Sequence, residues 1–104
     1  MRFLVVAQHP PDLCPSSNGK VREIAKQSGQ ELPSLAKKHG VKVTDNFVTQ
    51  TSHHVFIVAE ADDIESVRQL TIDGRLGQWN TVTIYPVNTL EEALATTDDL
   101  SPIF

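Results

Sequence analysis

The sequence predicts an α+β domain whose elements follow in the order strand, helix, strand, strand, helix, strand. Two observations support this order. Residues 2–9 and 53–60 are runs of β-branched and aromatic residues, long enough for a strand and too short for a membrane span. Elsewhere, over about residues 19–39 and 62–71, apolar residues recur with a helical period. The order is the ferredoxin-like split βαβ pattern, which gives an antiparallel sheet in the strand order 4-1-3-2.

The first strand, residues 2–9, has apolar side chains on both faces and ends at two prolines, which cannot donate to a β-ladder. A long loop leads to a helix over about residues 19–39. Pro33 lies inside this helix and Gly29 shortly before it, so we expect either a kink or two shorter helices. Gly40 is placed to cap the C-terminus.

A second strand is predicted over residues 41–50, with Asp45–Asn46 as a candidate bulge, and a polar turn then leads to the strand at 53–60. Asp62 is expected to cap the second helix, with Glu65 three residues later as in a capping box. The buried stripe of that helix is predicted to contain Ile64, Val67 and Leu70. The last strand covers residues 80–87, and a short helix and a tail, residues 89–104, complete the chain.

The length of 104 residues predicts a single domain over 1–104, with a core at 1–88 and the C-terminal helix and tail at 89–104. The net charge of −4 argues against a nucleic-acid or anionic-membrane partner, since both favour a basic surface. The single cysteine excludes an intramolecular disulfide and fits a reducing, cytoplasmic environment. The apolar run near Met1 is shorter than a usual signal-peptide core, so it is interpreted as a strand.

The second face of the predicted sheet is unusually apolar. Helices cover only one face of a ferredoxin-like sheet, and both central strands are apolar on each side. An exposed apolar face indicates an interface or a ligand surface, so a homodimer is expected. Val5 is assigned to that interface, and Val5→Asp is predicted to disrupt it.

The stretch Val55–Asp63, followed by a helix, resembles the GYD-domain group of the dimeric α+β barrel superfamily, and the likeness covers roughly residues 1–88. That superfamily includes muconolactone isomerases, antibiotic-biosynthesis-type monooxygenases and stress-responsive barrel proteins. The Gly-Tyr-Asp triplet is absent, and Thr51–His54 occupy the equivalent turn. The resemblance implies a dimer whose uncovered sheet faces meet as a barrel, and it transfers no catalytic residue.

Three histidines are the main candidates for function. His9 ends the first strand, while His53 and His54 begin the third; these strands are antiparallel neighbours, so the three side chains should lie close together. Imidazoles bind transition metals such as zinc and transfer protons near neutral pH. With His9 and His53, Cys14 can complete a metal site. The alternatives are histidines at a solvated rim and an inert or a reactive thiol.

Side-chain alternation groups His9 and His53 with the odd-numbered residues, which are assigned to the barrel cavity. His54 is then expected on the helix side or at the rim. Trp79 and Tyr85 are candidates for lining a small-molecule site, with core packing as the alternative.

Three functions remain open from the sequence. The first is a homodimer that binds a small ligand or a transition metal at the histidine end of the barrel. The second is a cofactor-free isomerase or monooxygenase in which His9 or His53 acts as acid or base. The third is a structural interaction module without a ligand.

Overall fold

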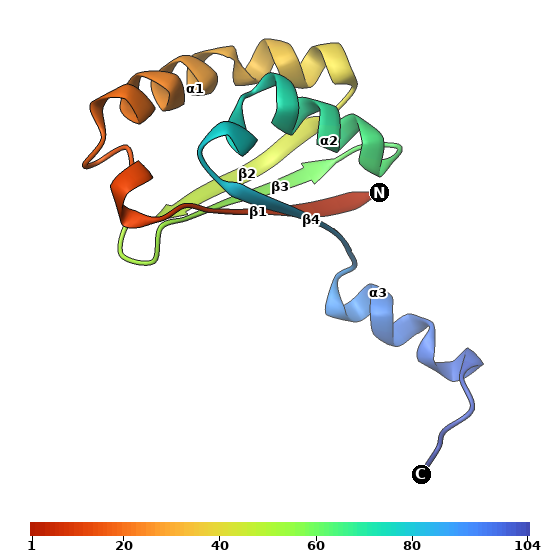
Figure 1. Ribbon diagram of the computed structural model, residues 1–104. Coiled ribbons are helices and arrows are strands. Elements are labelled where there is room, and N and C mark those ends of the chain that lie inside the picture. Colours follow the sequence, from red (N-terminus) through yellow and green to blue (C-terminus); the bar gives the residue numbers. More distant parts are fainter.

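The computed structural model describes residues 1–104 as a four-stranded antiparallel sheet with two helices on one face and a C-terminal arm (Figure 1). The strand order β2-β3-β1-β4 is the predicted one, and the α+β fold is broadly ferredoxin-like. The elements are β1 (Arg2–Gln8), α1 (Gly19–His39), β2 (Lys42–Thr49), β3 (His54–Glu60), α2 (Ile64–Asp73), β4 (Thr81–Val87) and α3 (Leu90–Ala95), with short 3-10 turns at Pro11–Leu13, Leu76–Gln78 and Thr97–Asp99. No helix combines the length and apolarity needed to cross a membrane.

The first helix has the predicted bounds and runs through its proline as one element. The side chain of Asn18 accepts hydrogen bonds from the first backbone N–H groups of α1, and Gly40 ends the helix in the left-handed conformation with φ 67°, as predicted. Pro33 lies inside α1, which continues through it, so the alternative of two separate helices is wrong. The proline ring meets the carbonyl of the residue four positions earlier. That residue is Gly29, which has no side chain to resist a small adjustment of the backbone.

The helix cap of α2 and the bulge of β2 each lie one residue away from their predicted positions. The cap of α2 is Asp63, whose Oδ1 accepts from the Ser66 N–H at 2.9 Å, so the prediction of Asp62 is wrong. Ile64 is 46% exposed rather than buried, because the helix begins one residue later and turns this side chain outward. The bulge in β2 falls between Val43 and Asp45, just before the predicted site.

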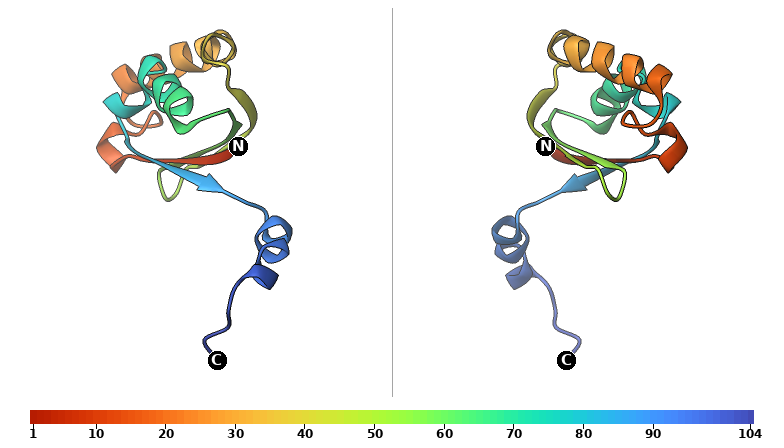
Figure 2. Two further views of the ribbon diagram at one scale, coloured as in Figure 1. Left: turned by 90° about the vertical axis from the view of Figure 1, so that its right-hand side faces the viewer. Right: turned by 90° about the vertical axis from the view of Figure 1, so that its left-hand side faces the viewer.

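The register of the strands fixes which residues lie under the helices. Val5 pairs with Ile57 on β3 and with Ile84 on β4, so the odd-numbered residues of β1 and β3 share a face with the even-numbered residues of β4. Both helices cover this face (Figure 2), and Phe3 and Val5 are fully buried there. The prediction that odd-numbered residues line a barrel cavity is therefore wrong, and Val5→Asp would damage the core. Ile84 and Val82 of β4, which pair with Val5 and Ala7, share this helix-covered face.

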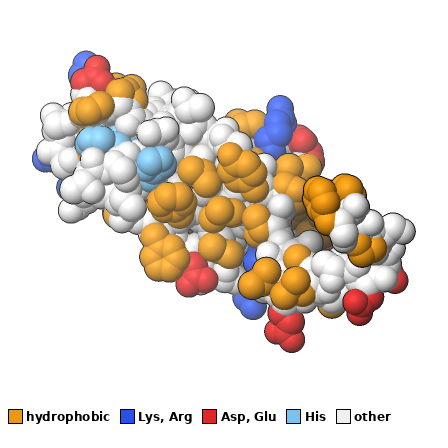
Figure 3. Space-filling view, turned by 90° about the horizontal axis from the view of Figure 1, so that it is seen from below, with side chains coloured by type: hydrophobic (Ala, Val, Ile, Leu, Met, Phe, Trp, Pro, Cys, Tyr) orange, Lys and Arg blue, Asp and Glu red, His pale blue; other side chains and the backbone are white.

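The opposite, open face of the sheet is largely apolar. The space-filling view from below shows hydrophobic side chains gathered over it, with histidines at one end (Figure 3). Its central side chains are half-buried, and those on the outer strands are exposed. This open face consists of Leu4, Val6, Phe47, Phe56, Val58 and Tyr85. No part of the same chain covers it.

The C-terminal arm, residues 88–104, leaves β4 and projects on the open-face side of the sheet (Figures 1 and 2). Thr89 and Glu92 form a capping box at the start of α3. Glu92 also pairs with Arg2 at 2.7 Å, which links the arm to the sheet. The large apolar side chains of the arm are all exposed: Leu90, Leu94, Leu100, Ile103 and Phe104.

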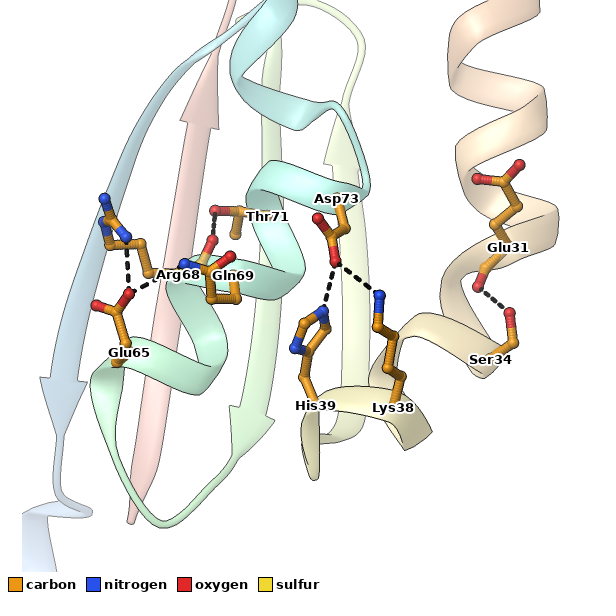
Figure 4. A network of polar contacts seen from close by, with 9 residues as sticks. All are labelled: Glu31, Ser34, Lys38, His39, Glu65, Arg68, Gln69, Thr71 and Asp73. Carbon is orange, nitrogen blue, oxygen red and sulfur yellow. Dashed lines mark hydrogen bonds and ion pairs between the residues drawn. The ribbon is translucent and has the colours of Figure 1, made fainter.

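Polar contacts join the two helices where α1 ends (Figure 4). His39 Nε2 lies 2.6 Å from Asp73 Oδ2, and Lys38 Nζ lies 3.7 Å from the same oxygen. The hydrogen bond from His39, assisted by Lys38, holds the pKa of the Asp73 carboxyl below its ordinary value. His39 therefore has a structural partner and lies outside the candidate site.

Candidate functional site

Three side chains from separate parts of the sequence meet at one end of the sheet. His9 directly follows β1, Cys14 follows the first 3-10 turn and His53 directly precedes β3. One ligand atom from each, a nitrogen of either imidazole and Cys14 Sγ, lies within 4.8 Å of the other two. His9 and Cys14 are 7% and 6% exposed, and His53 is half-buried. The cluster is therefore largely shielded from bulk water.

The backbone around the hairpin brings the two imidazoles together. The His9 N–H donates to the His53 carbonyl at 3.1 Å, which extends the ladder between β1 and β3 by one bond. His53 has φ 57°, a left-handed conformation that histidine adopts more readily than most residues. The rings of His9 and His53 meet edge to face, with centroids 5.4 Å apart. They converge as the strand order predicts, but on the helix-covered side of the sheet.

His54 and Tyr85 do not join this cluster. His54 stacks on Phe56 of the open face with ring centroids 5.5 Å apart, and its Nδ1 lies 3.0 Å from Ser52 Oγ. Tyr85 pairs with Leu4 and is exposed on the open face. The prediction that Tyr85 shares a cavity with His9 and His53 is therefore wrong.

The loop that carries Cys14 is held by hydrogen bonds from residues at the start of α1. The backbone N–H of Asn18 donates to the Cys14 carbonyl at 2.8 Å. Arg22 donates to the carbonyls of Pro15 and Ser16 at 2.8 and 3.1 Å. These bonds hold the thiol beside the histidines, and no sequence motif marks Asn18 or Arg22 for that role.

Asn80 orients the His9 ring. Its amide nitrogen donates to the Leu76 carbonyl at 3.0 Å, so its Oδ1 is turned toward His9 Nδ1 at 2.9 Å. An amide oxygen only accepts hydrogen bonds, so Nδ1 carries the proton and Nε2 keeps a free lone pair. His9 Nε2 is buried and has no hydrogen-bond partner, and the same holds for His53 Nδ1. Sequence reasoning missed Asn80, although extending the Gln8–Thr81 pairing by one residue places it opposite His9.

The thiol of Cys14 is biased toward its ionised form. Hydrogen bonds from the Ser16 hydroxyl, 2.8 Å from Sγ, and from the Ser16 backbone lower the pKa of Cys14 to about 6. Burial opposes this shift, and smaller contributions from His9 and His53 support it. At neutral pH the group is therefore mainly thiolate, the form that binds metals.

Trp79 covers the cluster from the side of β4. Its ring is 7% exposed and its centroid lies 5.1 Å from that of His9. Of the six residues singled out from the sequence, the structure thus gathers His9, Cys14, His53 and Trp79.

The donor set suits a borderline-soft cation. Two imidazole nitrogens and a thiolate are ligands of zinc and related transition metals. A triangle with sides of 4.8 Å has its centre about 2.8 Å from each corner, against roughly 2.0–2.3 Å for zinc–ligand bonds. An inward movement of each ligand atom of well under 1 Å would therefore produce bonding distances.

Comparison with known proteins gives a family but no activity. No curated protein matches the chain. The model of the family described as "Domain of unknown function (DUF3303)" matches residues 1–101, which is nearly all of the sequence. The chain therefore belongs to the DUF3303 family.

Proposed function

We propose that the protein binds one transition-metal ion, with zinc as the first candidate, through His9, Cys14 and His53. The observation that carries the proposal is the pair of buried imidazole nitrogens, His9 Nε2 and His53 Nδ1, that have no partner beside a thiol of low pKa. An unpaired buried polar atom costs roughly 1–3 kcal/mol, so such atoms usually have a ligand or water. A bound cation would accept both lone pairs and neutralise the thiolate.

Three protein ligands leave the fourth tetrahedral position free. Closed structural zinc sites use four protein ligands, whereas catalytic sites use three and keep one position for water or substrate. The arrangement of hydrogen bonds fits this type of site, since Asn80 donates no proton to His9 and instead fixes the tautomer that can coordinate. The centre we propose is therefore one that presents its metal to a small molecule. Such a thiolate site functions in a reducing compartment, which favours the cytoplasm.

Metal affinity is the direct test. Metal-free protein is titrated with zinc in competition with a chromophoric chelator, and we expect one ion per chain. His9→Ala, Cys14→Ser and His53→Ala should each weaken binding at least about 100-fold, because each removes one of three ligands. His54→Ala is the matched control, since this histidine is adjacent in sequence but lies on the open face. Equal losses for His54→Ala and His53→Ala would contradict the proposed ligand set.

A second candidate uses the same side chains without a metal. The lowered pKa of Cys14 beside two imidazoles suits a thiolate nucleophile or an acid–base pair with His9 or His53. In this case zinc would bind no better to the native protein than to Cys14→Ser. Alkylation of Cys14 would nevertheless be rapid at neutral pH and slower in Ser16→Ala, because the Ser16 hydrogen bonds contribute most to the lowered pKa.

We also propose that a second copy of the chain covers the open face, giving a homodimer in which two sheets enclose a barrel. The apolar side chains of the open face support this, as does the arm, whose exposed apolar residues project on that side. Val6→Asp should convert dimers to monomers in light scattering, and deletion of residues 97–104 should weaken the dimer. Ile72→Asp, on the exposed side of α2, should leave the mass unchanged. A monomer mass for the native protein across micromolar dilution would contradict the proposal.

A further inference from the structure

The centre of the helix–sheet layer and its β2 edge are packed differently. Under the helices, Phe3 and Val5 of β1 and Ala59 of β3 are fully buried. On β2, Val48 pairs with Val55 and so belongs to the same helix-covered face, yet it is 66% exposed. An apolar side chain that is exposed beneath a helix layer indicates that the layer is not closed there.

A cavity of about 380 Å³ occupies this part of the molecule, between α1, α2 and the β2–β3 half of the sheet. Its wall on α1 consists of Leu32 and three small residues, Ala25, Ser28 and Gly29, and the small residues leave part of the space unfilled. Twelve of its seventeen lining residues are hydrophobic, and none carries a charge. A cavity with this lining excludes phosphates, carboxylates and nucleotides, because a charged ligand would lose its hydration without gaining a partner.

Two buried hydrogen-bonding atoms in residues that line the cavity are unused. Neither Ser28 Oγ nor Trp79 Nε1 has a hydrogen-bond partner. This is unusual for a helical hydroxyl, which commonly bonds to a backbone carbonyl of the preceding turn. Ser34 on α1 does so with the Glu31 carbonyl at 2.9 Å, and Thr71, which also lines the cavity, does so with the Arg68 carbonyl at 2.7 Å (Figure 4). The Ser28 hydroxyl therefore remains available to a ligand.

We propose that this cavity binds a compact, neutral, mainly apolar carbonyl compound, whose oxygen accepts hydrogen bonds from Ser28 and Trp79. The indole N–H can only donate, so the group that meets it must be an acceptor. Dry apolar cavities of about 150 Å³ bind benzene, so the present one has room for a molecule of roughly two fused rings. The inference is independent of the metal proposal, because the cavity exists whether or not the Cys14 cluster holds an ion.

The cavity is also adjacent to that cluster. Trp79 lines the cavity and contacts the His9 ring, with the two centroids 5.1 Å apart. A bound molecule would thus lie one side chain away from His9.

The test uses three related probes and the only tryptophan of the chain. Tetralone, its hydrocarbon analogue tetralin and tetralin carboxylate are each titrated into ¹⁵N-labelled protein while the Trp79 indole N–H resonance is followed. We expect tetralone to bind and shift this resonance, tetralin to bind about 30-fold more weakly, and the carboxylate not to bind. The 30-fold difference is what the two hydrogen bonds from Ser28 and Trp79 contribute together, at about five-fold each.

Two variants and a control complete the test. Ser28→Ala should weaken tetralone binding about five-fold and leave tetralin unaffected. Ala25→Leu should abolish binding of both, because the larger side chain fills the cavity. Ser34→Ala, on the same helix, should change neither. Failure of tetralone to bind, equal affinity for tetralone and tetralin, or tetralone binding that survives Ser28→Ala unchanged would overturn the proposal. The Ser28→Ala comparison decides the matter even if Ala25→Leu does not fold.

Discussion

Asn80→Ala is the variant that separates a prepared metal centre from three side chains that merely lie close together. Asn80 is not itself a candidate metal ligand. Its Oδ1 accepts a hydrogen bond from the protonated Nδ1 of His9, and the two atoms lie 2.9 Å apart in a buried site. Removing such an outer partner typically lowers metal affinity about 10–100-fold. We expect a loss in that range for zinc, with the stoichiometry of one ion per chain unchanged.

The same variant should change the protonation of His9 before any metal is added. With Asn80 present, metal-free His9 should carry its proton on Nδ1, and in Asn80→Ala the two tautomers should become mixed. Nitrogen-detected NMR of the imidazole measures this directly. Asn88→Ala, at an exposed position after β4, is the control. Zinc affinity within two-fold of the native protein, together with an unchanged His9 tautomer, would refute the role assigned to Asn80.

Two further predictions follow from burial and charge. In metal-free protein the ultraviolet absorbance of the Cys14 thiolate should titrate with a midpoint near 6, and Ser16→Ala should raise that midpoint; a midpoint near 9.0 in the native protein would contradict the Ser16 contact. Because the pKa in the folded protein lies below the ordinary value of 9.0, the contribution of this group to stability is fully present above pH 9.0 and is lost as the pH falls through about 6. Val67→Ala should lower the free energy of unfolding, measured in urea, by about 2 kcal/mol, since it removes two fully buried methyl groups. The control Ile72→Ala, on the exposed side of α2, should change that free energy by less than about 0.5 kcal/mol, and equal effects would contradict the assignment of the core face.

The topology could be predicted because it depends on the order and period of apolar segments. The order of strands and helices left few alternatives, and the runs at β1 and β3 are the most apolar, as central strands should be. Which face of each central strand lies under the helices could not be predicted from those runs alone, because both faces of each strand are apolar. The decisive information was the register with β4, where Ile84 lies opposite Val5.

The candidate site was only partly visible in the sequence. His9 and His53 flank neighbouring antiparallel strands, so their proximity follows from the topology. The direction of the His53 side chain depends on a left-handed backbone conformation that no residue nearby signals. Ser16 and Arg22 act through hydrogen bonds to loop atoms, whose positions are set by the folded loop rather than by spacing in the sequence.

Cobalt substitution tests the central claim, that His9, Cys14 and His53 form one metal centre, most directly. One equivalent of Co²⁺ is added to the metal-free protein and the absorption spectrum is recorded. We predict strong visible bands of a four-coordinate ion and a near-ultraviolet thiolate-to-cobalt band, with the thiolate band lost in Cys14→Ser and both sets of bands lost when zinc is added. A weak spectrum typical of six oxygen ligands, or a thiolate band that persists in Cys14→Ser, would contradict the claim.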